Sequence, residues 1–378
     1  MKKNLFILAA TAAMLASCSN DETTAVNKTL NAPQEITFRS TTDGMTRAAD
    51  ITTSNLSTIY VTANKSGDPA TNDFGGTTPE TFTKAGSIFS SSTKHYWPAA
   101  GSLDFIAFAP ATGSEITRTD STSFSVTPNS TPASQVDFVY AVVRNQSKPT
   151  SSSGVALNFR HAESRVVIQL KNTSSDYKFT VNDVSLRYIK PTGVFHPVFK
   201  TSDGSQVGFS TDGTNVSNIT SDAGYYIAPS AWSASGTETN YTQTASTTSY
   251  PINTTTPAAL ADAMILIPQT LTTATQYSAA TDGASFNGAC ISVEMKIQNT
   301  SDEYQGGSAA GTFITGIFPL PAIQWLPGHQ YTYTVDLAGG GYYLTNHDTD
   351  IELDPILENV EIKFINVTVD GWVAVDGN

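Results

Sequence analysis

The sequence predicts an all-β protein with two antiparallel β-sandwich domains in series, and three observations support this. Ser and Thr are abundant beside 15 Tyr and 18 Phe, while only 14% of residues are charged, a composition typical of sheets. Alternating apolar and polar residues recur along the chain, and no stretch of about fifteen residues keeps a helical spacing of apolar residues. Clusters of Gly, Ser, Thr, Asn, Asp and Pro separate the alternating segments, as turns do.

The expected strands are short, and many short strands separated by turns favour antiparallel sandwiches. Their ranges are 56–63, 155–159, 166–170, 179–186, 264–267, 291–297, 331–335, 360–364 and 367–369. Three large aromatic residues, Trp97, Phe105 and Phe108, are expected in the core. Cys290 stands in an alternating apolar stretch and is expected to be a small buried side chain rather than a nucleophile.

A shift in composition suggests where the two domains divide. Residues 201–218 are rich in Gly, Ser, Thr and Asp, so the boundary is predicted near residue 200, giving domains 48–200 and 201–378. Residues 233–256 are dense in Thr and Ser. This stretch is expected to be a long loop inside the second domain.

The N-terminus has the pattern of an export signal. Lys2 and Lys3 precede an apolar run that ends at Leu15, which is shorter than the roughly 20 apolar residues of a membrane-spanning helix. Residues 1–17 therefore read as a secretory signal peptide. The run Leu15-Ala16-Ser17-Cys18 resembles the lipobox of bacterial lipoproteins, so lipidation (palmitate among the acyl chains) is expected on Cys18, with attachment to the outer membrane. The alternative is an ordinary signal peptide with an incidental Cys.

Charge and motifs narrow the function classes. The formal net charge of −13 makes nucleic acid an unfavourable partner. The sequence contains no G-x-S-x-G, H-E-x-x-H or phosphate-binding Gly loop, so we expect no enzyme, no cofactor and no metal site. His161 with Glu163 is too sparse a pattern for a metal. A glycosidase that uses two separated carboxylates stays open at this point.

Eight segments, taken in order, resemble the fimbrillin-like family of Bacteroidetes, which includes subunits of the type V pilus. Residues 155–166 resemble the family pattern L-x-F-x-H-A-x-S-x-V most clearly. The other segments are 96–98, 103–110, 137–141, 184–186, 193–195, 265–269 and 325–333. The resemblance covers roughly residues 36–375 and implies two transthyretin-like β-sandwiches, with no catalytic residues.

The resemblance also implies processing. In type V pilins an Arg-specific protease removes the lipid anchor together with the first strand. Arg47 and Ala48 are placed like that cleavage site, so residues 18–47 would be a propeptide. The strand displaced on maturation would contain Ile36 and Phe38. Arg39 is a competing cleavage site.

The strand that replaces the propeptide strand is expected from the C-terminus of another subunit. Excision would leave an unpaired sheet edge, which readily accepts an added strand. The donor residues implied by the resemblance are Val360, Ile362, Phe364, Val367 and Val369.

The implied function is a subunit of a cell-surface fimbrium that forms a homo- or heteropolymer. The alternative is a lipid-anchored surface adhesin or glycan-binding protein, such as a tip or anchor subunit, which would bind a host or bacterial ligand. It would use exposed aromatics such as Tyr225, Tyr226, Trp232, Tyr342 or Tyr343.

Overall fold

The computed structural model describes residues 33–41, 55–120, 123–149, 154–196, 198–200, 206–208, 232–244, 250–272, 277–280, 283–286, 288–305, 311–347, 350–355 and 365–371. Strands dominate these ranges, which contain the short 3-10 turns Pro132–Ser134 and Leu337–Gly339 and no α-helix. No helix among them is long and apolar enough to cross a membrane. The all-β prediction is confirmed for this part of the chain.

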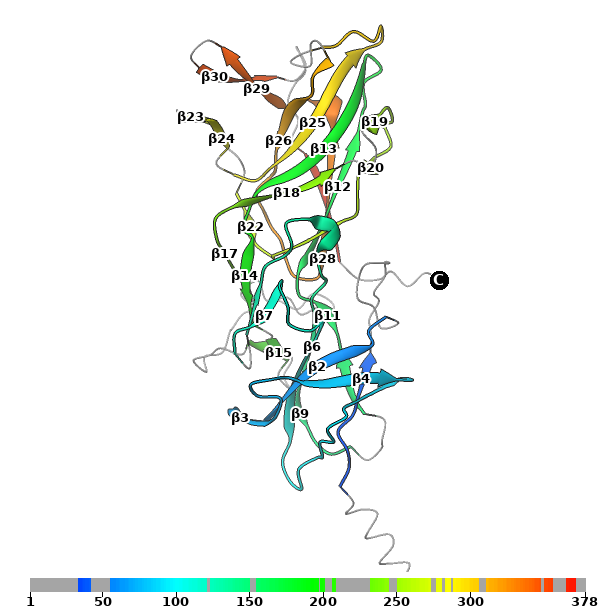
Figure 1. Ribbon diagram of the computed structural model, residues 1–378, viewed down its shortest axis with the longest axis vertical. Helices are drawn as coiled ribbons and strands as arrows, with labels where there is room; N and C mark the ends of the chain where they lie inside the picture. The colour runs from blue at the N-terminus through cyan, green and yellow to red at the C-terminus, as the bar shows by residue number, and fades with distance from the viewer. Residues whose placement is uncertain are drawn as a thin grey trace, which may run out of the picture.

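The first sheet lies in the lower part of the elongated molecule in Figure 1. Its strands are β1 Phe38–Thr41, β2 Thr58–Lys65, β3 Asp68–Phe74, β4 Glu80–Ala85, β5 Ile88–Ser90, β6 Leu103–Ala109, β9 Val139–Gln146, β10 Val155–Asn158 and β11 Arg160–His161. Their order is β10-β1-β5-β4-β2-β6-β9-β11, with β3 paired to β2. Because Phe159 alone separates β10 from β11, the sheet curls until its two ends meet in one chain segment.

The apolar side chains inside this curl form the first core. Alternate residues of β2, such as Ile59 and Val61, point into it, as the two-residue period of a strand requires. Phe38 is fully buried there, and its ring meets the rings of Phe82 and Phe105 edge to face, with centroids 4.8 and 5.1 Å away. Trp97 and Phe105 are buried in the same core, which confirms that prediction.

Two further sheets enclose a second core in the upper part of Figure 1. One contains β12 Ser164–Lys171, β20 Ala258–Ala259, β21 Met264–Leu266, β28 His329–Asp336 and β31 Asn366–Gly371. The other contains β13 Tyr177–Ile189, β18 Thr239–Thr244, β19 Tyr250–Ile252, β25 Cys290–Asn299, β26 Ile314–Pro319, β29 Tyr342–His347 and β30 Asp350–Pro355. Side chains of β12 and β28 from one sheet join those of β13 and β25 from the other in a single cluster, the arrangement of a sandwich.

Cys290 begins β25, and its side chain is fully buried. Burial raises the pKa of its thiol to about 12. Both observations confirm the expected role as a small buried side chain.

A smaller sheet lies where the two cores meet. Its strands are β7 Ile116–Arg118, β8 Phe124–Val126, β14 Thr192–Phe195 and β17 Trp232–Ser235, in the order β17-β14-β8-β7. A third cluster, with Phe108, Phe138, Phe195 and Trp232 among its members, packs this sheet against the outer face of β6 and β9. Three two-stranded ribbons complete the described strands: β15 Val198–Lys200 with β16 Gln206–Gly208, β22 Thr270–Leu271 with β27 Ile323–Gln324, and β23 Tyr277–Ala280 with β24 Gly283–Phe286.

The chain passes between the cores through a buried crossover, residues 161–164. The Ala162 N–H donates to the Phe138 carbonyl (2.8 Å), and the Trp232 indole N–H donates to the Ala162 carbonyl (2.7 Å). The Gly328 N–H donates to the Glu163 carbonyl (2.8 Å). These bonds hold the crossover from both sides, so it is packed structure rather than a flexible linker.

Acidic groups are buried at this crossover. Glu163 is fully buried, and its Oε2 accepts a hydrogen bond from the Phe138 N–H (3.1 Å). Its pKa is raised well above the ordinary value, first by burial and further by the charges of Asp137 and Glu115. His161 Nδ1 lies 2.8 Å from Asp137 Oδ1. The environment therefore favours the neutral form of Glu163.

The two cores meet in the chain between Phe159, the last residue of the first cluster, and Val166, the first of the second. Strands β12 and β13 pack in the second core, although the predicted boundary near residue 200 assigns them to the domain 48–200. As a division into independently folding domains, that boundary stays a prediction. The packing itself changes near residue 160.

The expected loop at 233–256 was wrong, because this stretch contains strands β18 and β19 and most of β17. Both β18 and β19 pair with β13, and Tyr241 and Gln243 of β18 are buried. The stretch was misjudged because Thr dominates it. Thr is polar enough for a turn, yet its β-branched side chain suits a strand.

A pair of carboxyl groups faces across β13 and β25, where Asp183 is directly opposite Glu294. Burial raises the pKa of Asp183 to about 6, assisted by the hydrogen bond to Glu294 and by the negative charge of Glu294, whereas Arg187 acts in the opposite direction. Acidic residues directly opposite each other in a ladder are unfavourable when both are charged.

We expect Phe38→Ala to lower the free energy of unfolding of the intact chain by about 3–5 kcal/mol, because it leaves a cavity between Phe82 and Phe105. The matched control is Arg39→Ala, since the Arg39 side chain is exposed and should change stability by less than about 0.5 kcal/mol. Denaturant unfolding followed by tyrosine and tryptophan fluorescence measures both. Equal effects of the two substitutions would contradict the described packing of β1.

A second prediction concerns pH. Since the folded-state pKa of Asp183 is raised to about 6, wild-type stability is lost as the pH rises through that value. Asp183→Asn should therefore raise the Tm relative to the wild type above pH 6 and leave it unchanged near pH 4. The control is Asp176→Asn at an exposed site. A Tm difference that does not vary with pH would argue against the carboxyl pair.

Candidate functional site

The candidate site is the position of β1 in the first sheet. β1 pairs on one side with β10, in parallel from Phe38 opposite Val155 to Thr41 opposite Asn158. On the other side it pairs with β5, antiparallel, with Phe38 opposite Phe89. No other described strand joins β5 to β10. β1 therefore closes the curled sheet.

Backbone hydrogen bonds extend this pairing to the residues before β1. The Ile36 N–H donates to the His95 carbonyl (2.8 Å), and the Trp97 N–H donates to the Gln34 carbonyl (3.0 Å). From the β10 side, the Val155 N–H donates to the Thr37 carbonyl (2.8 Å). The segment 34–41 thus binds through its main chain on both sides.

Side chains of the segment alternate between the core and the surface. Ile36 and Phe38 are buried, with 1% and 0% of their surface exposed. At the rim, Lys94 Nζ lies 2.6 Å from Glu35 Oε2. This ion pair is largely exposed, and such pairs contribute little to stability. Binding of the segment therefore depends on its backbone and its two apolar side chains.

Gly154 lets the chain before β10 approach the segment closely. A Cβ at this position would lie 3.1 Å from both the Thr37 carbonyl oxygen and the Phe38 carbonyl carbon.

 The φ angle of Gly154 is +74°, a conformation that glycine adopts without strain. Any larger residue at this position would have to push the segment 34–41 away.

The structure places the predicted site residues as follows. Ile36 and Phe38 lie in the candidate site, as buried members of the first core. Val367 and Val369 lie in β31, which pairs antiparallel with β28 at the edge of its sheet. Val367 packs against the second core, whereas Val369 is 45% exposed. The remaining predicted site residues, Cys18, Arg47, Ala48, Val360, Ile362 and Phe364, lie outside the described residues.

Arg39, the competing cleavage site, is part of β1 and is paired with Ala156 of β10. Its side chain is exposed, but its backbone belongs to the sheet. Proteases cut exposed, unpaired segments in preference to strands. The pairing of Arg39 therefore favours a site outside β1, such as Arg47.

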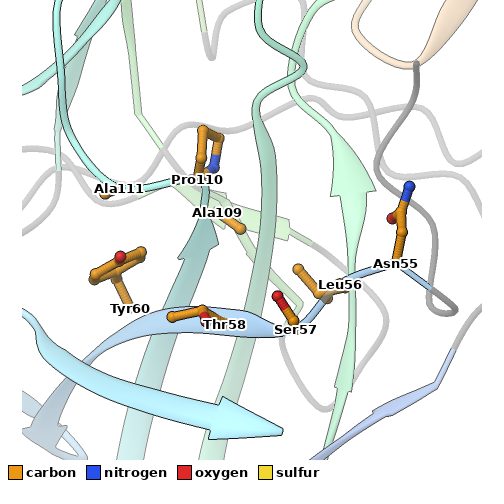
Figure 2. Close-up of a pocket in the computed structure, with 8 residues that line it drawn as sticks. All are labelled: Asn55, Leu56, Ser57, Thr58, Tyr60, Ala109, Pro110 and Ala111. Atoms are coloured by element: carbon orange, nitrogen blue, oxygen red, sulfur yellow. The ribbon is translucent and has the colours of Figure 1, made fainter.

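A pocket of about 230 Å³ lies beside the start of β2 and the end of β6. Figure 2 shows Thr58 and Tyr60 from β2 on one side and Ala109, Pro110 and Ala111 on the other. Asn55, Leu56 and Ser57 complete its lining. No Asp, Glu, His, Lys or Arg side chain lines this pocket.

Two sequence-based ideas about binding residues change with the structure. Trp232 was expected to be an exposed aromatic of an adhesin, and this was wrong: it is 7% exposed and packs in the third cluster. His161 has a carboxylate partner, Asp137, that lies 24 positions earlier in the chain and gave no local signal. Among the described residues, no group of three or more His, Cys, Asp or Glu could hold a metal ion.

Several solved structures are similar to this chain. They include a candidate cell adhesion protein from Bacteroides uniformis, with 15% identity, coverage of 91% of this chain and 99% of that one, and a TM-score of 0.43. A candidate cell adhesion protein from Bacteroides ovatus has 14% identity, coverage of 92% and 100%, and a TM-score of 0.44. A fimbrilin from Porphyromonas gingivalis has 9% identity, coverage of 91% and 98%, and a TM-score of 0.39.

A comparison with curated proteins finds no match. The sequence model of the fimbrillin-like family matches residues 46–372. Because this match spans well over half of the 378 residues, the chain belongs to the fimbrillin-like family.

Proposed function

We propose that this chain is a structural subunit of a cell-surface fimbrium, which polymerises after an Arg-specific protease removes its first strand. Membership of the fimbrillin-like family supports the role of a pilus subunit. In this proposal the protein has no catalytic activity of its own. Its function is to bind other subunits end to end.

The observation that carries the proposal is the position of β1. It lies between β5 and β10, it supplies Ile36 and Phe38 to the core, and it precedes Arg47 in the chain. Cleavage after Arg47 would leave β1 attached only by non-covalent contacts. Its departure would expose two strand edges and an apolar cavity, which together accept a new strand.

The finer parts of the proposal rest on the sequence. Residues 1–17 would direct export, and lipid on Cys18 would hold the precursor at the outer membrane until cleavage. Cleavage would separate that anchor from the sandwiches, so the mature subunit would leave the membrane. The transthyretin-like topology expected for both sandwiches belongs to this finer proposal.

The C-terminal segment would supply the replacing strand, as the family resemblance implies. In such a contact the C-terminal segment of one subunit occupies the β1 position of the next subunit. Contacts of this head-to-tail kind generate a filament rather than a closed dimer. An adhesin that keeps its lipid would instead remain monomeric and anchored. The experiment below separates these two functions.

Incubation of the purified chain with an Arg-specific protease should yield a product that begins at Ala48 and forms filaments, because loss of β1 opens the first sheet. N-terminal sequencing and electron microscopy measure the two results. Arg47→Ala should remain uncut and monomeric, whereas Arg39→Ala should behave as the wild type. A trimmed chain that stays monomeric would contradict polymerisation.

A further inference from the structure

Three acidic side chains lie close together at the buried crossover between the two cores, and the proposed function uses none of them. Glu163 belongs to the crossover itself, Asp137 precedes β9, and Glu115 precedes β7. All three are buried, Glu163 completely. Among the described residues they do not form a group that could hold a metal ion. Their charges must therefore be balanced by hydrogen bonds, by neighbouring side chains or by protons.

Two of the three acids have partners that compensate a negative charge. Asp137 Oδ1 lies 2.8 Å from Nδ1 of the His161 ring. Glu115 Oε2 accepts a hydrogen bond from the Val136 N–H (3.1 Å). A side chain that can carry a positive charge and a backbone donor both favour the ionised form of the carboxyl that they face.

Glu163 is the least compensated of the three. Its Oε2 accepts one hydrogen bond from the Phe138 N–H, but its buried Oε1 has no hydrogen-bond partner among the described residues. Burial is the largest cause of its raised pKa, and the negative charges of Asp137 and Glu115 add to it. A fully buried carboxyl in these surroundings is therefore favoured in its protonated, neutral form.

The other ionisable groups around Glu163 do not offset its charge. His161 and Arg165 are two residues away on either side, and His161 faces Asp137. Neither is among the charges that act on the pKa of Glu163. From β18, Tyr241 faces the acids, and its pKa is raised to about 12 by burial and then by the charges of Glu163 and Glu115. Tyr241 thus stays neutral in the range in which Glu163 ionises.

We propose that the crossover is a pH-sensitive joint between the two cores, in which the proton on Glu163 keeps residues 161–164 seated and its loss at higher pH unseats them. An ionised Glu163 would be a buried charge without a compensating partner, which is strongly unfavourable. Contact with water relieves this cost, and it requires the crossover to leave its packed position. The inference does not rest on the proposed function, because Glu163 lies outside β1.

The indole of Trp232 reports directly on the seated position. Its N–H donates to the carbonyl of Ala162, next to Glu163 (2.7 Å). Trp325 provides a matched control, because its indole N–H donates to the Tyr333 hydroxyl (2.8 Å) inside the second core. Unseating of the crossover should break the first of these bonds and leave the second in place.

NMR spectra of the isotope-labelled full chain test the joint by following both indole N–H signals as the pH is raised from about 5 to about 10, the range in which strongly shifted buried carboxyls ionise. In the wild type the chemical shift of the Trp232 indole should change with pH, whereas that of Trp325 should stay constant. In Glu163→Gln, which keeps the shape of the neutral acid without its proton, the Trp232 signal should stay constant as well. Glu115→Gln should retain the response of the wild type.

Three results of this experiment would overturn the proposal. The first is a Trp232 signal that stays constant over the whole range in the wild type. The second is a response that persists in Glu163→Gln, which would assign it to another group such as His161. The third is a response that Glu115→Gln removes and Glu163→Gln does not.

Stability gives a second readout, and linkage fixes its sign. Because the folded-state pKa of Glu163 is raised, its stabilisation is complete below the unfolded value of about 4.3 and is lost as the pH rises through the folded value. The unfolding equilibrium constant of the wild type, divided by that of Glu163→Gln, should therefore rise about tenfold per pH unit in that window. Denaturant unfolding at a series of pH values measures this ratio.

The control for stability is Glu303→Gln, since Glu303 is exposed and its ratio should not vary with pH above about 5. A Glu163→Gln chain that is less stable than the wild type near pH 7, or that does not fold, would mean that the seated crossover holds an ionised Glu163. Either outcome would overturn the proposed joint.

Discussion

The closure of the first sheet by β1 is the constraint on which the rest of the structure depends. A strand between two others satisfies backbone groups on both of its edges, and here it also supplies Ile36 and Phe38 to the core between the faces of the curl. Every other described strand of this sheet comes after β1 in the chain, and the next one, β2, begins at Thr58. One short element at the start of the chain therefore completes a core that the later residues build.

β1 binds tightly to the first sheet, yet its contacts do not require that it stay covalently attached to the other strands. The contacts of β1 are main-chain hydrogen bonds and buried apolar side chains, and neither kind depends on a covalent link to the rest of the sheet. A strand of similar pattern from elsewhere can make the same contacts.

The buried crossover connects this site to the second core. β10, which flanks β1, continues through Phe159, β11 and residues 162–163 directly into β12. Hydrogen bonds from Trp232 and Gly328 hold that run from both sides. A strand bound at the β1 position therefore contacts a segment that continues from the first core into the second.

Much of the fold follows from local sequence patterns. Alternation of apolar and polar residues predicted β10, β12, β13, β25 and β28, because successive side chains of a strand point to opposite faces and only one of those faces is buried. Strands β18 and β19 of the Thr-rich stretch 233–256 escaped notice, since the few apolar side chains there left the period weak. Part of the candidate site could also be predicted from the sequence, because Ile36 and Phe38 stand in an alternating segment ahead of Arg47.

Other features were decided only by tertiary structure. That β1 lies between β5 and β10, that Asp137 faces His161 and that β12 and β13 belong to the second core all depend on residues distant in the chain. Strand order is set by which edges pair and which faces pack, and local alternation is the same for either neighbour. For the strongly alternating segments, the sequence by itself therefore determined that they are strands and which of their faces are buried, and the tertiary structure decided which strand closes the sheet.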